Sequence, residues 1–248
     1  MAGIYRSWPL PGTEFDEAGL IEAYRRPDRA EPWLRVNFVM SADGAATQDG
    51  LSGGLSSASD KKVFGLLRRL CDVVLVGAGT VRIEGYGAMV LGARSARWRA
   101  EHGLPEQPVF GIVSGALELD PRSPVFAEAP VRPIVFTSER APAARREELQ
   151  RVADVVVCGA AEVDPAAMMA ALAERGLTQV LCEGGPTLFG TLLRADRVDE
   201  LCLTLSPKLE GGEAIRIVRG ALDQPIDLEL AQVLVAGDEL ILRYLRSS

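Results

Sequence analysis

Short apolar runs alternate along the chain, from residue 33 onward, with segments whose apolar residues recur every three or four positions. Residues 34–41 form the first apolar run. The segment 57–70 follows with Val63, Leu66 and Leu67 on one helical face, and a serine at 57 or 59 is placed to cap it. Alternation of this kind is typical of an α/β fold. We therefore predict a mixed, mostly parallel central sheet flanked by helices.

The rest of the chain continues the same pattern. Further strands are predicted at 73–76, 109–113, 133–136, 155–158 and 180–182, and helices near 141–151 and 166–175. The last apolar runs, 198–206, 228–235 and 239–245, follow one another without long helical segments. Strands in direct succession pair antiparallel, so we expect an antiparallel C-terminal edge on the sheet.

The first 33 residues differ from the remainder. Prolines at 9, 11, 27 and 32 bracket one amphipathic segment, about 16–26. We predict an N-terminal arm over residues 1–33, with one short helix used for packing or for dimer contact, and a single domain over residues 34–248.

Charge and hydropathy limit the partners. The chain has 27 basic and 34 acidic residues, a net charge of -7, and no dense cluster of Lys and Arg that would follow a nucleic-acid backbone. No apolar run approaches the roughly 18 residues of a membrane span, and the N-terminus lacks the apolar core of a signal peptide. We expect a cytoplasmic protein with neither nucleic acid nor membrane as partner.

Cysteine and histidine usage argues against a metal site. The four cysteines are widely spaced and form no C-x-x-C, and three lie in strand-like runs, as buried thiols do. His102 is the only histidine, and it lies in a charged segment that looks irregular. A zinc site built on histidines is excluded, and a serine hydrolase would have only His102 as its base.

Two strand-to-helix junctions carry glycines where a helix begins. Gly77 and Gly79 precede Thr80, and Glu183 precedes a Gly-Gly-Pro-Thr segment. Glycines at this place let the backbone approach a ligand, and free amides at a helix start attract anions. If the two strands are adjacent, both turns face one crevice, and a pyrophosphate spans them. The predicted contacts are Gly77, Gly79, Thr80, Gly184, Gly185, Pro186, Thr187 and Leu188.

Ionisable candidates lie near these turns. Asp43 and Glu183 each end a strand, and Glu84 follows the first glycine turn. Simpler roles stay open: Asp43 shapes an Asp-Gly turn, and Glu183 caps a helix. Arg68 or its neighbour Arg69 is placed to reach an anionic substrate. Ser114, after another strand, either meets a ribose 2′-phosphate or forms an ordinary turn.

Several motifs occur together in a familiar order: Ser41-Ala-Asp-Gly44, Leu66-Leu-Arg68, Val76-Gly-Ala-Gly-Thr-Val81, Glu183-Gly-Gly-Pro-Thr-Leu188 and Pro207-Lys-Leu-Glu-Gly-Gly212. Over about residues 34–246 the chain resembles the reductase half of the riboflavin-pathway deaminase-reductases, which is similar in fold to dihydrofolate reductase. The zinc signature of the deaminase half is absent from this sequence.

The resemblance implies a homodimeric enzyme that passes a hydride from NADPH to a ribosylaminopyrimidine phosphate of the 5-amino-6-ribosylaminouracil type. It implies NADPH contacts at Thr80, Glu84, Ser114 and residues 185–191. It implies substrate contacts at Ser52, Arg68 and Glu183. For catalysis we predict that Glu183 or Asp43 orients the heterocycle or a proton-delivering water. Relatives of this fold have a cis peptide at the position of Gly184-Gly185.

The chain also departs from the family pattern. Ala45 stands where a Lys or Arg usually follows Asp-Gly, and Glu84-Gly-Tyr86 replaces an Asp-Asp-Pro. The cation that usually follows is missing until Arg94. Two alternatives therefore stay open: a reductase of a folate, a pterin or another pyrimidine, and an NADPH-binding protein without turnover. A serine hydrolase is disfavoured because no G-x-S-x-G occurs.

Overall fold

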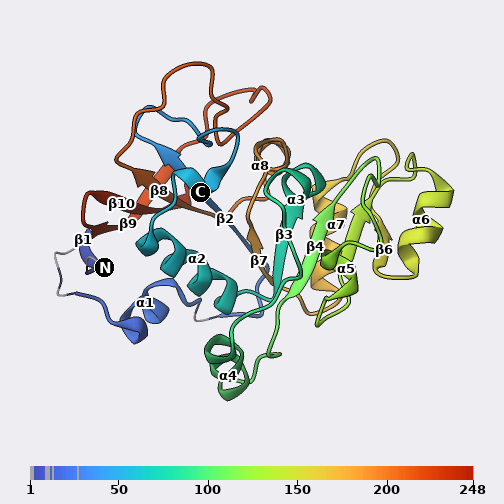
Figure 1. Cartoon of the computed structure of the whole chain (residues 1–248), viewed down its shortest axis with the longest axis horizontal. Helices are drawn as coiled ribbons and strands as arrows, with labels where there is room; N and C mark the ends of the chain where they lie inside the picture. Colours follow the sequence, from blue (N-terminus) through green and yellow to red (C-terminus); the bar gives the residue numbers. More distant parts are fainter. Residues whose placement is uncertain (1–2, 9–11, 13, 27, 248) are drawn as a thin grey trace.

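The computed structural model describes residues 3–8, 12, 14–26 and 28–247, and a ten-stranded sheet organises them (Figure 1). The strands are β1 (Tyr5–Trp8), β2 (Trp33–Ser41), β3 (Val73–Gly77), β4 (Val109–Val113), β5 (Ile134–Thr137), β6 (Asp154–Val157), β7 (Gln179–Cys182), β8 (Glu200–Ser206), β9 (Leu228–Ala236) and β10 (Glu239–Arg246). Their order is β1-β9-β10-β8-β2-β7-β3-β4-β5-β6. Neighbours from β8 to β6 are parallel, and β8, β10, β9 and β1 pair antiparallel. The predicted mixed sheet with an antiparallel C-terminal edge is confirmed.

Helices cover both faces of the sheet. They are α1 (Glu17–Tyr24), α2 (Ala58–Leu70), α3 (Ala78–Ile83), α4 (Ala93–Glu101), α5 (Pro124–Ala127), α6 (Ala143–Gln150), α7 (Pro165–Ala173) and α8 (Pro186–Arg194), with a 3-10 turn at Ser52–Gly54. Val74 and Val76 of β3 pack in one core with α1 and α2, while Val73 and Leu75 pack in a second core with α7 and α8. Because both faces of β3 are covered, its sequence is apolar without alternation.

The capping signals in the sequence act as expected. Ser57 is the N-cap of α2, and its side chain accepts hydrogen bonds from the amides of Ser59 and Asp60. Asp164 caps α7, which has Pro165 at its first position, and Gly176 follows the helix with a φ of 72°. These helix bounds are set by local chemistry, which is why they are visible in the sequence.

The short helix α5, the 3-10 turn, β1 and α4 were not expected. β1 adds to β9 at the edge of the sheet, within the residues taken as an arm, and α4 occupies the charged segment predicted to be irregular. Arg99 explains α4: its buried guanidinium donates to the carbonyls of Arg69, Cys71 and Pro105. Such a helix lacks the apolar face that marks helices in a sequence. The prolines at 9, 11 and 27 lie outside the described residues.

A buried ionic cluster joins the two halves of the sheet. The Glu200 carboxylate on β8 accepts from Arg35 Nε of β2 and from Arg243 Nε of β10, both at 2.8 Å, and from Trp33 Nε1 at 2.9 Å. Burial raises the pKa of Glu200, but Arg35 and Arg243 outweigh it and lower the pKa from 4.5 to about 2. The cluster therefore stays charged. Removing one charged partner would leave the opposite charge buried without a counter-ion.

We expect Glu200→Gln to lower the free energy of unfolding by about 3–5 kcal/mol, because it leaves two buried guanidinium groups without their anion. Glu118→Gln is the matched control, since the exposed Glu118–Arg82 pair at 3.9 Å contributes about 1 kcal/mol or less. Urea unfolding measures both. Equal losses in the two variants would contradict the role of the cluster.

The same cluster predicts a pH dependence. The pKa of Glu200 is lower in the folded chain than its ordinary value of 4.5, so its stabilisation is complete above that value and is lost as the pH falls toward about 2. The stability difference between the wild type and Glu200→Gln should therefore shrink over this interval. Urea titrations at stepped pH measure it, and a difference that stays constant down to pH 2 speaks against the shift.

Candidate active site

The two glycine turns meet at the carboxyl edge of the sheet. β3 and β7 are parallel neighbours, and the amide of Gly77 donates to the carbonyl of Gly184 at 2.8 Å. The Gly184–Gly185 peptide is cis, and Gly184 has a φ of 101°. The two turns are therefore adjacent at one edge of the sheet, which is the condition that the predicted crevice requires.

Close contact between the turns explains the glycine at 185. A Cβ added to Gly185 would lie 2.4 Å from Thr80 Oγ1, so a side chain does not fit there. Gly185 is also the N-cap of the nine-residue helix α8, and no side chain caps that helix. Pro186 has no amide hydrogen, so the exposed Thr187 offers a first-turn amide that no helical carbonyl accepts. The turn thus fits a phosphate group.

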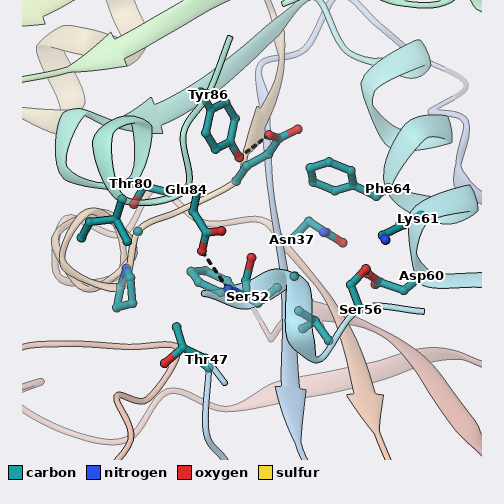
Figure 2. A pocket seen from close by; sticks show the side chains of 18 of the residues that line it. Asn37, Thr47, Ser52, Ser56, Asp60, Lys61, Phe64, Thr80, Glu84 and Tyr86 are labelled. Atoms are coloured by element: carbon teal, nitrogen blue, oxygen red, sulfur yellow. Dashed lines mark hydrogen bonds between the residues drawn. The ribbon is translucent and has the colours of Figure 1, made fainter. Parts of the chain in front are cut away.

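A pocket of about 470 Å³ lies beside the turns (Figure 2). Its walls come from β2, the loop after β2, α2, the segment after α3 and the turn before α8. Of the predicted site residues, it brings together Ser52, Arg68, Thr80, Glu84, Glu183, Gly185 and Pro186. Segments far apart in the sequence therefore build one cavity.

Glu183 is the most constrained polar side chain in this pocket. Arg68 holds it in a bidentate pair, with Nε to Oε1 and Nη2 to Oε2 both at 2.6 Å. Tyr86 donates its hydroxyl to Oε2 at 2.9 Å, as the dashed line in Figure 2 shows. The Glu183 side chain is only 1% exposed. Both Glu183 and Arg68 were predicted as site residues from the sequence, but their ion pair with each other was not predicted.

The partners of Glu183 keep their protons. Burial alone lowers the pKa of Arg68. The hydrogen bonds and the charge of Glu183 raise it by more than burial lowers it, so the net shift is upward. Burial and the nearby Glu183 charge raise the pKa of Tyr86 well above its usual value. Arg68 is therefore a cation and Tyr86 a hydrogen-bond donor at any working pH. Phe64 covers the guanidinium of Arg68 at 4.2 Å and shields the pair from solvent.

Glu84 links two loops of the pocket wall. Its Oε1 accepts from the backbone amide of Ser52 at 2.9 Å (Figure 2). The sequence placed Glu84 with the cofactor and Ser52 with the substrate. Their hydrogen bond puts the two residues on a shared part of the wall.

Asp43 is not brought into the pocket. It is exposed, and its carboxylate accepts from the amides of Glu210 and Gly211 and from the Ser41 hydroxyl. The Ser41 hydroxyl and these backbone amides lower the pKa of Asp43 to about 2. The turn-shaping interpretation of Asp43 fits these contacts, because its oxygen atoms are used to hold the 210–211 loop against the end of β2.

Ser114 also lies away from the pocket lining. It follows β4, and its hydroxyl accepts from the amide of Leu117 at 3.0 Å. That contact is typical of a serine that shapes a turn. Ala45 is buried, and Arg94 of α4 pairs with Glu17 of α1 at 2.6 Å.

Sequence reasoning missed several residues of the pocket wall. Asp60, Lys61 and Phe64 on α2, and Asn37 on β2, line the cavity (Figure 2). Lys61, Phe64 and Arg68 have the i, i+3, i+7 spacing of one helical face. That spacing was a usable signal, but a Lys on an amphipathic helix is ordinarily a solvated residue.

The thiols and the histidine take no part in the site. All four cysteines are buried and free, and burial raises the pKa of Cys71 and of Cys182 to about 12. His102 ends α4, where its ring stacks on Trp98 at 3.9 Å.

Within the described ranges, no group of three or more His, Cys, Asp or Glu side chains is arranged to hold a metal ion. Over the same ranges, no helix has the length and apolar character to cross a membrane.

A mostly parallel sheet with two glycine turns and an adjoining pocket at its carboxyl edge defines an α/β protein whose pocket lies where open α/β folds bind their ligands. Residues 32–242 match the family model of the RibD C-terminal domain, and the chain belongs to that family. The resemblance drawn from the short motifs is thereby confirmed.

Relatives and solved structures agree with this assignment. A Methanothermobacter thermautotrophicus protein named 2,5-diamino-6-ribosylamino-4(3H)-pyrimidinone 5′-phosphate reductase is 31% identical over 219 residues, which cover 86% of this chain and 97% of the relative. A protein of the same name from Archaeoglobus fulgidus is 28% identical and matches 73% of this chain and 83% of its own. The structure of a pyrimidine reductase-like protein from Corynebacterium diphtheriae superposes with a TM-score of 0.80 at 26% identity, over 88% of this chain and 92% of that one.

Because the two turns are in close contact, we predict that adding a methyl group at Gly185 lowers the stability of the protein, whereas adding one at Gly79 does not. Gly185→Ala should cost about 1–3 kcal/mol of stability, because the new Cβ meets Thr80 Oγ1 at 2.4 Å. Gly79→Ala is the control, since nothing lies within 4 Å of its Cβ. Adding Thr80→Ala to Gly185→Ala should recover most of the loss. Urea unfolding distinguishes the variants, and equal stability of Gly185→Ala and Gly79→Ala would refute the close contact.

Proposed function

We propose that this protein is an NADPH-dependent reductase that transfers a hydride to a ribosylaminopyrimidine phosphate of the riboflavin pathway. The observation that carries the proposal is the pair of turns joined by the Gly77–Gly184 hydrogen bond, beside a pocket that contains the fixed Glu183 carboxylate. It is supported by the 31% identity to the Methanothermobacter relative over 97% of that relative, whose name gives a diaminopyrimidinone phosphate as the compound reduced.

NADPH is assigned to the crevice formed by the two turns. The first-turn amide of Thr187 and the close approach at Gly185 suit its pyrophosphate. Thr80 and Glu84 line the pocket next to these turns and are assigned to the nicotinamide end. When bound, NADPH supplies the hydride, so the protein's task is to place the acceptor carbon about 3–3.5 Å from the donor carbon.

Glu183 is assigned to orient the heterocycle. An ionised carboxylate only accepts hydrogen bonds, which suits the N–H groups of an aminopyrimidine. Arg68 and Tyr86 fix the carboxylate in one orientation, and its burial strengthens each hydrogen bond made to it. The contacts of Arg68 thus make it a residue that positions Glu183, in addition to any substrate contact.

We further infer a homodimer that works in the cytoplasm on small molecules. The exposed edge of the sheet supports self-association: Trp8 of β1 is 48% exposed, and Leu228 and Leu230 of β9 are 40% and 36% exposed. Exposed apolar side chains on the edge strand β1 and its neighbour β9 favour contact with another copy. Light scattering of the purified chain tests the dimer, and a monomer at all concentrations would end this part of the proposal.

Oxidation of NADPH, followed by absorbance, tests the activity. The acceptors to compare are the phosphorylated 2,5-diamino-6-ribosylaminopyrimidinone, the phosphorylated 5-amino-6-ribosylaminouracil and dihydrofolate. The second candidate, a pterin or folate, is favoured by the presence of Asp60 and Glu84 in the pocket wall. Carboxylates accept hydrogen bonds from the aminopyrimidine edge of such a ring, and this recognition does not require the ligand to carry a phosphate. Turnover confined to dihydrofolate would replace the first proposal with the second. NADPH binding without oxidation of any acceptor would leave a non-catalytic protein.

Glu183→Gln should lower kcat/KM by at least tenfold, because an amide cannot keep both the bidentate pair and the acceptor geometry. Tyr86→Phe, which removes only the hydroxyl donated to Glu183, should lower it less, by about three- to tenfold. The dissociation constant of NADPH should stay unchanged in both. Glu147→Gln on the exposed face of α6 is the matched control. Turnover of Glu183→Gln within threefold of the control would remove Glu183 from the mechanism.

A further inference from the structure

The charges in the pocket wall do not balance. Its charged side chains are Asp60, Lys61, Arg68, Glu84 and Glu183. Arg68 and Glu183 neutralise each other through their bidentate pair at 2.6 Å. Asp60 and Glu84 are then opposed by Lys61 alone. The wall thus carries one net negative charge even with Lys61 counted, so a dianionic group is held only where Lys61 is nearer to it than Asp60 and Glu84 are.

Lys61 is available for that purpose. It is exposed at the pocket wall, and within the described residues it forms no ion pair with any carboxylate. The neighbouring Asp60 accepts the hydroxyl of Ser56 instead, and Figure 2 shows the Lys61 amino group at the cavity beside Phe64. The Lys61 ammonium is therefore not held by a carboxylate of the described residues.

Among the described residues that line the pocket, the cations are Lys61 and Arg68. Ala45, close to the Asp-Gly turn, is buried and uncharged, and Arg94 of α4 pairs with Glu17 of α1. Lys61 and Arg68 share one face of α2 and lie seven residues apart, about 10 Å along the helix axis. Lys61 therefore lies about two helical turns before Arg68, the residue that holds Glu183, and lines the same pocket.

We propose that Lys61 binds the 5′-phosphate of the substrate. The inference rests on the proposed function and adds the residue that recognises the phosphate. A phosphate monoester carries a charge of about -1.5 to -2, which a Lys ammonium matches as a point charge at the pocket mouth. Arg68 stays with Glu183 and serves the ring end.

Kinetics with a phosphorylated and a dephosphorylated substrate test the assignment. Lys61→Met should raise KM for the ribosylaminopyrimidine phosphate by about 10- to 100-fold, as expected for the loss of a hydrogen bond between charged groups. Its kcat should stay within threefold, and values for the dephosphorylated compound should not change. Lys61→Arg should restore most of the affinity. Lys62→Met is the matched control, because Lys62 is exposed on the same helix and does not line the pocket. Equal KM values for Lys61→Met and Lys62→Met would overturn the proposal.

Direct binding separates this inference from the proposed function. Calorimetry with ribose 5-phosphate needs no turnover, and we expect binding to the wild type that weakens at least tenfold in Lys61→Met. The affinity for NADPH should stay the same. Absence of ribose 5-phosphate binding to the wild type, or a loss of NADPH affinity in Lys61→Met, would reject Lys61 as the substrate phosphate site. Intact sugar-phosphate binding together with no oxidation of NADPH by any pyrimidine would instead reject the proposed function.

Discussion

The hydrogen bond from the Gly77 amide to the Gly184 carbonyl is the contact on which the site depends. It holds two strand-to-helix turns together at the carboxyl edge of neighbouring parallel strands. Thr80 then lies so close to residue 185 that only glycine fits, and α8 starts with an uncapped first turn. The pocket lies beside this contact, and Thr80 and Gly185 are part of its wall. A small separation of the two turns would change the crevice and the pocket wall together.

Two buried carboxylates with similar partners serve different purposes in this fold. Glu200 is enclosed by Arg35, Arg243 and Trp33, and it joins strands of the parallel and antiparallel parts of the sheet. Glu183 has one guanidinium and one phenol, and it lines an open cavity. The difference lies in what remains free around each carboxylate. A saturated carboxylate stabilises the fold, whereas one with an open side is able to bind a ligand.

β2 connects these two regions. Its first half carries Arg35 into the buried cluster, and Asn37, Phe38 and Val39 line the pocket. Its end is held by Asp43, which binds the 210–211 loop. Tyr86 and Arg68 hold Glu183 in place, and Lys61 of α2 lines the same pocket.

The sequence by itself determined the order of strands and helices, the caps at Ser57 and Asp164, and the two glycine turns. These features depend on residues a few positions apart, so they are legible along the chain. The tertiary structure alone decided which charges meet. Arg68 and Glu183 are 115 residues apart, and Asp43 is drawn to a loop 167 residues away, so neither pairing leaves a local pattern. The same reason hides α4, whose Arg99 binds carbonyls of other segments, and β1, whose partner strand lies at the far end of the sequence.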